Sequence, residues 1–270
     1  MLSDITLGQF LPGNSVLHRM DPRVKLILIF ACIVFIFVAN NFWSLLCMIL
    51  LVLGGMMLSG IPVGQYLKSL RAILVIVVFT SVLNLFYGSG DLLFKLGVME
   101  IRVGGVMNSI FIAIRIISLI LFSAILTFTT SPTQLTDAME RIMKPLSIFH
   151  IKVHEIAMMM TIALRFVPTL LEETDKIMSA QKARGADMES GGLMQRAKAL
   201  IPILIPLFVS SFRRAYDLAM AMECRCYHGG EGRTKMKSLH ITSLDIWSCC
   251  ITGIFFVAVV VSNLLLPSSF

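Results

Sequence analysis

Two arginines that end predicted long helices are the residues of this sequence best suited to bind a partner protein. Arg184 follows Ala180 by four positions and Arg225 follows Ala221 by four, so each alanine lies on the face of its arginine, one turn earlier. A small residue lets a partner's backbone approach, and a guanidinium offers a planar fork of donors to carboxylates or carbonyls. Two such ends would suit a partner with two equivalent grooves. The alternative is that a cation merely complements the dipole at each helix terminus.

Other residues that could do chemistry fit known sites poorly. Cys224, Cys226 and His228 alternate as C-x-C-x-H, which lacks the spacing and the fourth ligand of a structural zinc site. His150 and His154 are four apart but do not form the HExxH motif of metalloproteases. We therefore expect no metal site.

Catalysis and nucleotide binding by this chain alone also lack support. The acidic run Glu172, Glu173 and Asp175 is better explained by pairing with Lys176 or by contact with a partner than by catalysis. No G-x-x-x-x-G-K-[ST] run is present, so the chain does not bind ATP through a P-loop. The sequence has no basic patch interleaved with aromatic residues, so it gives no indication of nucleic-acid binding.

The composition places much of the chain in a lipid bilayer. Of its 270 residues 57% are hydrophobic and only 14% are charged, whereas soluble domains carry about a quarter charged residues. The charge is also uneven, because 26 of the 39 charged residues lie within 131–240. We predict a membrane domain at 1–130, a cytoplasmic helical domain at 131–240 and a final transmembrane helix at 241–270.

Five apolar stretches are candidates to cross the bilayer, each near the length of about 20 residues that a helix needs. They are about 24–39, 42–59, 72–88, 105–130 and 243–266. Asn40-Asn41 separates the first two, and mixed charges occupy 91–104. Basic residues precede the first span, follow the second and are frequent in the insert, which predicts a cytoplasmic N-terminus and insert. Arg115 inside the fourth span faces either a polar groove or partner, or snorkels to the outer interface.

The insert is predicted to form long amphipathic helices that dock a partner. One follows the capping box Ser131-Pro132-Thr133-Gln134, and another runs from about Val153 to Arg184, with Gly185 as its stop. A third starts near 190–192 and reaches about Arg225, and its apolar residues recur every three or four positions. These are Ala197, Ile201, Leu204, Phe208, Phe212, Ala215, Ala219 and Met222.

Several of these segments together resemble one known family. The stretch from Ser211 to Arg225, SFRRAYDLAMAMECR, is similar to the signature of the T component of energy-coupling factor (ECF) transporters, and Ala183-Arg184-Gly185 to its first Ala-Arg-Gly motif. The opening GQF-x-PGNS, residues 8–15, and HRMDPRVK, residues 18–25, resemble T components that several substrate-binding subunits share. The likeness covers nearly the whole chain.

The resemblance implies a non-catalytic coupling subunit with defined partners. In this family the T component joins two cytoplasmic ABC-type ATPase subunits, which use ATP and magnesium, to a small membrane substrate-binding (S) subunit that takes up vitamins or other micronutrients. By resemblance the ATPase-docking residues are Ala183, Arg184, Gly185, Ala221, Glu223 and Arg225. The chain itself is expected to bind no cofactor and to lie in the cell membrane of a bacterium.

One departure from the family pattern concerns the second motif. Cys224 and Cys226 replace the usual Ala and Gly around Arg225, which puts the close backbone approach at Cys226 in question. The competing classes are a stand-alone intramembrane enzyme and a secondary transporter. The second would predict inverted repeats and ionisable residues at mid-membrane.

Overall fold

The computed structural model describes residues 10–86, 92–96, 99–186, 192–230 and 239–265. Its regular structure there is helical, apart from one short β-hairpin, which confirms the predicted all-α class. In chain order the elements are α1 (Val16–Arg19), α2 (Pro22–Val38), α3 (Phe42–Ser59), α4 (Val63–Leu85), β1 (Leu92–Leu96), β2 (Met99–Arg102), α5 (Val103–Thr129), α6 (Pro132–Met143), the 3-10 helix η1 (Lys144–Phe149), α7 (Val153–Ala183), α8 (Leu193–Glu223) and α9 (Ser243–Leu265).

The chain forms two compact units, each described by itself below. The membrane unit holds Gly8–Ala138 and Ser238–Phe270, and the insert unit holds Met139–Lys237. The membrane unit is therefore built from two segments that are distant in sequence, with α9 joining the helices of the N-terminal half.

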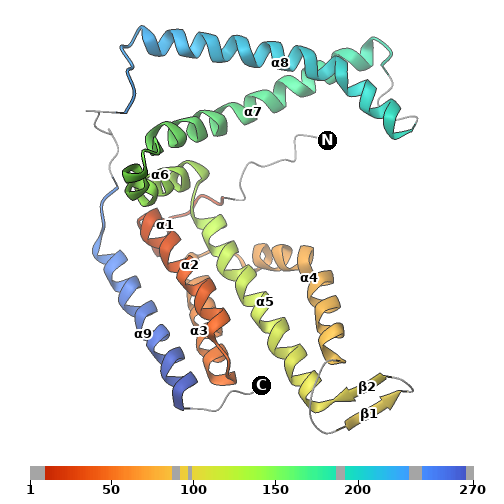
Figure 1. Ribbon diagram of the computed structural model, residues 1–270, viewed down its shortest axis with the longest axis vertical. Coiled ribbons are helices and arrows are strands. Elements are labelled where there is room, and N and C mark those ends of the chain that lie inside the picture. The colour runs from red at the N-terminus through yellow and green to blue at the C-terminus, as the bar shows by residue number, and fades with distance from the viewer. Residues whose placement is uncertain (1–9, 87–91, 97–98, 187–191, 231–238, 266–270) are drawn as a thin grey trace. The chain divides into compact units, whose positions relative to one another are not determined.

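The core of the membrane unit lies between α2, α3, α5 and α9, which pack against one another (Figure 1). Ile36, Met48, Val52, Ile125 and Val259 are all buried there. Large apolar side chains also cover the outward faces of these helices, which suits a lipid environment because helices satisfy their own backbone hydrogen bonds.

The predicted break at Asn40-Asn41 is confirmed, and local hydrogen bonds explain it. α2 ends at Val38 and α3 begins at Phe42. The Asn41 amide donates to Ser44 Oγ at 3.1 Å, as part of a capping box that starts α3. The Asn41 side-chain amide donates to the carbonyl of Ser262 at 3.2 Å, so the turn is also tied to the end of α9.

The third helix differs from its prediction at its N-terminal end. α4 begins at Val63, whereas the sequence predicts a span at 72–88 and a loop before it. Pro62 caused the error, because proline is compatible with a helix start as well as with a loop. α4 bends by 59° between its parts Val63–Arg71 and Ile73–Leu85.

The first part of α4 is held in place by Tyr66. Its side chain is almost fully buried, and its hydroxyl lies 2.9 Å from Ser59 Oγ at the end of α3. Its ring packs edge-on against Phe128 of α5 with 5.4 Å between centroids. This part of α4 therefore belongs to the packed core rather than to a surface loop.

A two-stranded hairpin, which no pattern in the sequence predicts, occupies the mixed-charge segment. β1 pairs with β2 in antiparallel register, with Lys95 opposite Glu100. Strands of five and four residues are too short to show a clear alternating pattern in sequence. The hairpin leads directly into α5.

Several helices of the described residues are long and apolar enough to cross a membrane. The five that meet this condition singly are Phe42–Ser59, Val103–Thr129, Val153–Ala183, Lys198–Glu223 and Ser243–Leu265. The two parts of α4 meet it together as a bent pair. Of the predicted spans, α2 is the shortest, with 17 residues. α7 and α8 are amphipathic and carry many more charges than the others, and their cytoplasmic location stays a prediction.

The insert unit is dominated by α7 and α8, which cross as two long rods (Figure 1). A carboxylate joins them, because Glu173 of α7 accepts hydrogen bonds from Ser210 Oγ and from the guanidinium of Arg214, both on α8. The sequence instead suggests that this acidic run pairs with Lys176 or contacts a partner. The partner on α8 lies far along the chain, and one sequence gives no signal for such pairing.

Candidate partner-docking site

The end of α7 is a left-handed turn built around a glycine. Gly185 has φ +84°, a conformation that L side chains rarely adopt. Its amide donates to the carbonyl of Lys182 at 3.0 Å, and the Ala186 amide donates to that of Gln181 at 3.0 Å. This pair of hydrogen bonds is the Schellman motif, which satisfies carbonyls that a helix end leaves open. Arg184 directly precedes the glycine.

The end of α8 has the same hydrogen-bond pattern without a glycine. Cys226 has φ +55°. Its amide donates to the carbonyl of Glu223 at 2.8 Å, and the Tyr227 amide donates to that of Met222 at 3.1 Å. Arg225 directly precedes the left-handed residue, as Arg184 does in α7. The two termini therefore share one backbone motif, which the likeness of their sequences only suggested.

Both arginines are available for binding. Arg184 and Arg225 are exposed, and neither guanidinium has a hydrogen-bond or ion-pair partner among the described residues. Ala183 and Gly185 beside the first arginine are exposed as well, and no heavy atom of the described residues lies within 4 Å of a Cβ built on Gly185. Ala221 and Glu223 are also exposed on the last turns of α8.

The two termini lie at opposite ends of the crossed helices. α7 runs toward the connection to α8, and α8 runs back past α7 (Figure 1). α8 has 31 residues, which corresponds to a length of about 45 Å. The structure thus presents two equivalent arginine ends that are well separated from each other.

The cysteines and histidines considered as metal ligands do not form a cluster in the described ranges. Cys224, Cys226 and His228 are exposed, and in the described ranges no three His, Cys, Asp or Glu side chains group as metal ligands would. His154 Nδ1 lies 3.0 Å from Glu140 Oε1, which is an ion pair when the histidine is protonated.

Comparisons with known proteins identify the family of this chain. Residues 13–236 match the CbiQ family, described as a cobalt transport protein. The chain is 51% identical over 255 residues to the energy-coupling factor transporter transmembrane protein EcfT of Ruminiclostridium cellulolyticum, an alignment that covers 94% of this chain and 96% of that protein. This chain belongs to the family of ECF transporter T components. Proteins of the same name from Thermosediminibacter oceani (47% identity; 97% and 99% covered) and Bacillus subtilis (46%; 91% and 93%) agree.

The resemblance predicted from the motifs is thereby confirmed. The T component is the transmembrane component of an ECF transporter and a multi-pass membrane protein, and the relatives just named are transporter subunits rather than enzymes. Residues of the opening motif HRMDPRVK form hydrogen bonds to distant segments of the chain.

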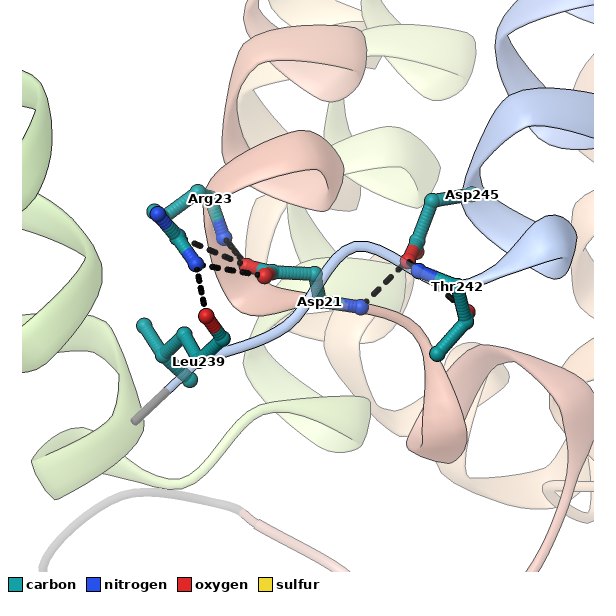
Figure 2. Close-up of polar contacts among 5 residues, drawn as sticks. All are labelled: Asp21, Arg23, Leu239, Thr242 and Asp245. Atoms are coloured by element: carbon teal, nitrogen blue, oxygen red, sulfur yellow. Dashed lines mark hydrogen bonds and ion pairs between the residues drawn. The ribbon is translucent and has the colours of Figure 1, made fainter. Parts of the chain in front are cut away.

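A polar cluster at the start of α2, whose Asp21 and Asp245 are buried, holds the chain that enters α9 (Figure 2). The Asp21 amide donates to Asp245 Oδ1 at 2.8 Å, and the other oxygen of Asp245 accepts from the amide (2.7 Å) and hydroxyl (2.8 Å) of Thr242. Arg23 donates to the Asp21 carboxylate at 3.0 Å and to the carbonyl of Leu239 at 2.7 Å. We call Asp21, Arg23, Lys25, Thr242 and Asp245 the root cluster.

Lys25 extends the root cluster to the place where the chain leaves α5. Its ammonium group donates to the carbonyl of Thr129 at 3.1 Å and to the hydroxyl of Thr130 at 3.0 Å. Lys25 is almost fully buried, so these contacts compensate for its loss of water. The first turn of α2 thus binds both segments that connect the membrane unit to residues of the insert.

Arg115, for which the sequence leaves two roles open, contacts the end of α2. Its Nη2 donates to the carbonyl of Ala39 at 2.7 Å, just beyond the last residue of α2. Its guanidinium carbon lies 4.8 Å from the centre of the Phe111 ring, which permits a cation–π contact. The side chain therefore reaches toward the end of α2 and satisfies a carbonyl there.

One face of α8 is apolar and exposed. The predicted stripe includes Ile201, Leu204, Phe208 and Phe212, and all four side chains are exposed. α8 uses a different face toward α7, where Ser210 and Arg214 meet Glu173. The stripe is therefore open to a partner.

Proposed function

We propose that this T component couples ATP hydrolysis to micronutrient uptake. It would transmit the motion of two cytoplasmic ABC-type ATPase subunits to a small membrane substrate-binding subunit for vitamins or other micronutrients. The observation that carries the proposal is the pair of identically built helix ends, each with an exposed arginine that has no partner within the described part of the chain.

Each arginine end is proposed to occupy a groove of one ATPase subunit. Arg184 and Arg225 supply guanidinium donors for carboxylates or carbonyls of the groove. Ala183, Gly185 and Ala221 leave room for close backbone contact, and Glu223 adds a charge at the second end. Equivalent backbone motifs at both ends support binding to two copies of one kind of subunit, because equivalent grooves require equivalent ligands.

ATP and magnesium are assigned to the ATPase subunits, since this sequence has no P-loop. The basic residues around the first two spans and in 131–240 support an N-terminus and insert on the cytoplasmic side of a bacterial cell membrane. That side is also where ATP is present.

The exposed stripe on α8 is proposed to contact the membrane substrate-binding subunit. From Leu200 to Phe212 the sequence has no charged residue, which suits an apolar partner rather than a soluble ATPase. Phe208 is 65% exposed and lies near the middle of the helix. Burying such side chains against a membrane protein would give the contact its affinity.

The test is a charge reversal at both helix ends in the assembled transporter. We expect Arg184→Glu with Arg225→Glu to abolish co-purification of the ATPases and ATP-driven uptake, because removing one partner of a buried charged contact costs about 2–5 kcal/mol. Arg213→Glu is the matched control, since Arg213 is exposed on α8 but away from its end. A double variant that keeps both ATPases and full uptake would refute the docking role.

A further inference from the structure

The short connection between α6 and α7 exposes two large apolar side chains at its tip. Ile148 is 79% exposed and Phe149 is 78% exposed, which places them among the most exposed large apolar residues described. Two adjacent, largely exposed apolar side chains form a surface that is unfavourable in water and that a contact could cover.

The backbone of this connection is well defined. Pro145 occupies the start of η1, a position that proline tolerates because the first amides of a helix have no internal partner. His150 caps η1; it has φ +62°, and its amide donates to the carbonyl of Ser147 at 3.0 Å. The turn therefore holds Ile148 and Phe149 between two ordered helices.

Basic residues surround the apolar tip. Arg141, Lys144 and Lys152 are exposed, and no acidic residue occurs between the first and the last of them. Lys152 also forms an ion pair with Glu155 at 3.1 Å. Among the described residues around the tip, Arg141 and Lys144 therefore supply most of the positive charge that is not in an ion pair. An apolar tip flanked by cations is the pattern of segments that enter the headgroup region of anionic membranes.

The connection also lies close to the membrane along the chain. α5 ends at Thr129, and α6 begins three residues later and has 12 residues, which corresponds to about 18 Å of helix. We propose that the tip at Ile148 and Phe149 inserts into the cytoplasmic headgroup region of an anionic bilayer, with Arg141 and Lys144 contacting lipid phosphates. This inference is independent of the ATPase-docking proposal.

A tryptophan at the tip tests the proposal in the full-length chain. Trp43 and Trp247 are both exposed and are first replaced by phenylalanine, and Phe149→Trp then provides the only tryptophan. The protein is reconstituted into vesicles of phosphatidylglycerol and phosphatidylcholine whose acyl chains are brominated near the headgroup. We expect the brominated lipid to quench the fluorescence of this Phe149→Trp variant strongly, and iodide added to the water to quench it little.

Two control positions calibrate the measurement. Phe30→Trp, in the middle of α2, reports a residue in the acyl region, and Met194→Trp, on the first turn of α8, reports a similarly exposed residue of the insert unit. Quenching of the Phe149→Trp variant by iodide but not by brominated lipid would overturn the proposal. So would lipid quenching that disappears once the ATPases or a membrane subunit are added, because the tip would then be a subunit contact.

The contribution of the cations is tested separately. In vesicles of phosphatidylcholine alone we expect brominated lipid to quench the Phe149→Trp variant less, because Arg141 and Lys144 lose their anionic partners. Adding Arg141→Gln with Lys144→Gln to this variant should cause the same reduction in anionic vesicles. Unchanged quenching in both experiments would refute the role of the two cations.

Discussion

The backbone amide of Asp21 donates a hydrogen bond of 2.8 Å to the carboxylate of Asp245, a residue 224 positions later in the chain. Both side chains are almost fully buried. Asp245 also accepts from the amide and hydroxyl of Thr242, so one carboxylate serves three donors. A buried acceptor with several donors is costly to remove, because the donors lose their partner without regaining water.

The first prediction concerns the stability that Asp245 provides. Asp245→Asn should lower the free energy of unfolding by about 1–3 kcal/mol, because the amide nitrogen cannot accept a hydrogen bond and the charge-assisted contacts are lost. Thermal unfolding in detergent, followed by intrinsic fluorescence, measures the change. Asp217→Asn is the control, since Asp217 is exposed on α8. Equal melting temperatures for both variants would contradict the assigned role.

The second prediction concerns the left-handed residues that end α7 and α8. Cys226→Gly should stabilise the end of α8 by about 1 kcal/mol, because a side chain at φ +55° costs energy that glycine avoids. Gly185→Cys should destabilise the end of α7 by a similar amount. Hydrogen exchange of the Tyr227 and Ala186 amides measures each local effect.

The two substitutions also serve as controls for each other. Each exchanges cysteine and glycine within the same Schellman motif, so the expected effects have opposite signs. Slower exchange at Ala186 in the Gly185→Cys variant, or faster exchange at Tyr227 in the Cys226→Gly variant, would show that the two ends do not share the same conformational requirement.

The third prediction concerns the exposed stripe of α8. Phe208→Asp should reduce co-purification of the membrane substrate-binding subunit at least severalfold, because a carboxylate in an apolar contact is left without a partner. The ATPases should still be recovered, since both arginine ends are unchanged. Phe208→Leu keeps the site apolar and should retain the subunit. Loss of the ATPases instead would assign the stripe to them.

Much of the fold could be predicted from the sequence, because the bilayer imposes long uncharged segments. The helices at 42–59 and 243–265 agree with their predicted bounds to within a residue. α4 was predicted too short because Pro62 is compatible with two local structures. The hairpin was missed because its strands are too short to give a pattern.

The residues proposed to dock the ATPases could be predicted as motifs, but their backbone geometry could not. Arg184 and Arg225 were identified by their spacing and by family resemblance, whereas the shared Schellman motif depends on the backbone of Cys226. The root cluster could not be predicted, because its members come from both ends of the chain. The link between Glu173 and Arg214 was missed for the same reason.

The root cluster binds the chain at two places that lie far apart in the sequence. Lys25 holds the chain as it leaves α5, and Arg23 holds it as it returns toward α9. Exit and return are thus pinned to a single turn of α2, two residues apart. The two chain segments that lead toward the insert are thereby held close together within the membrane unit.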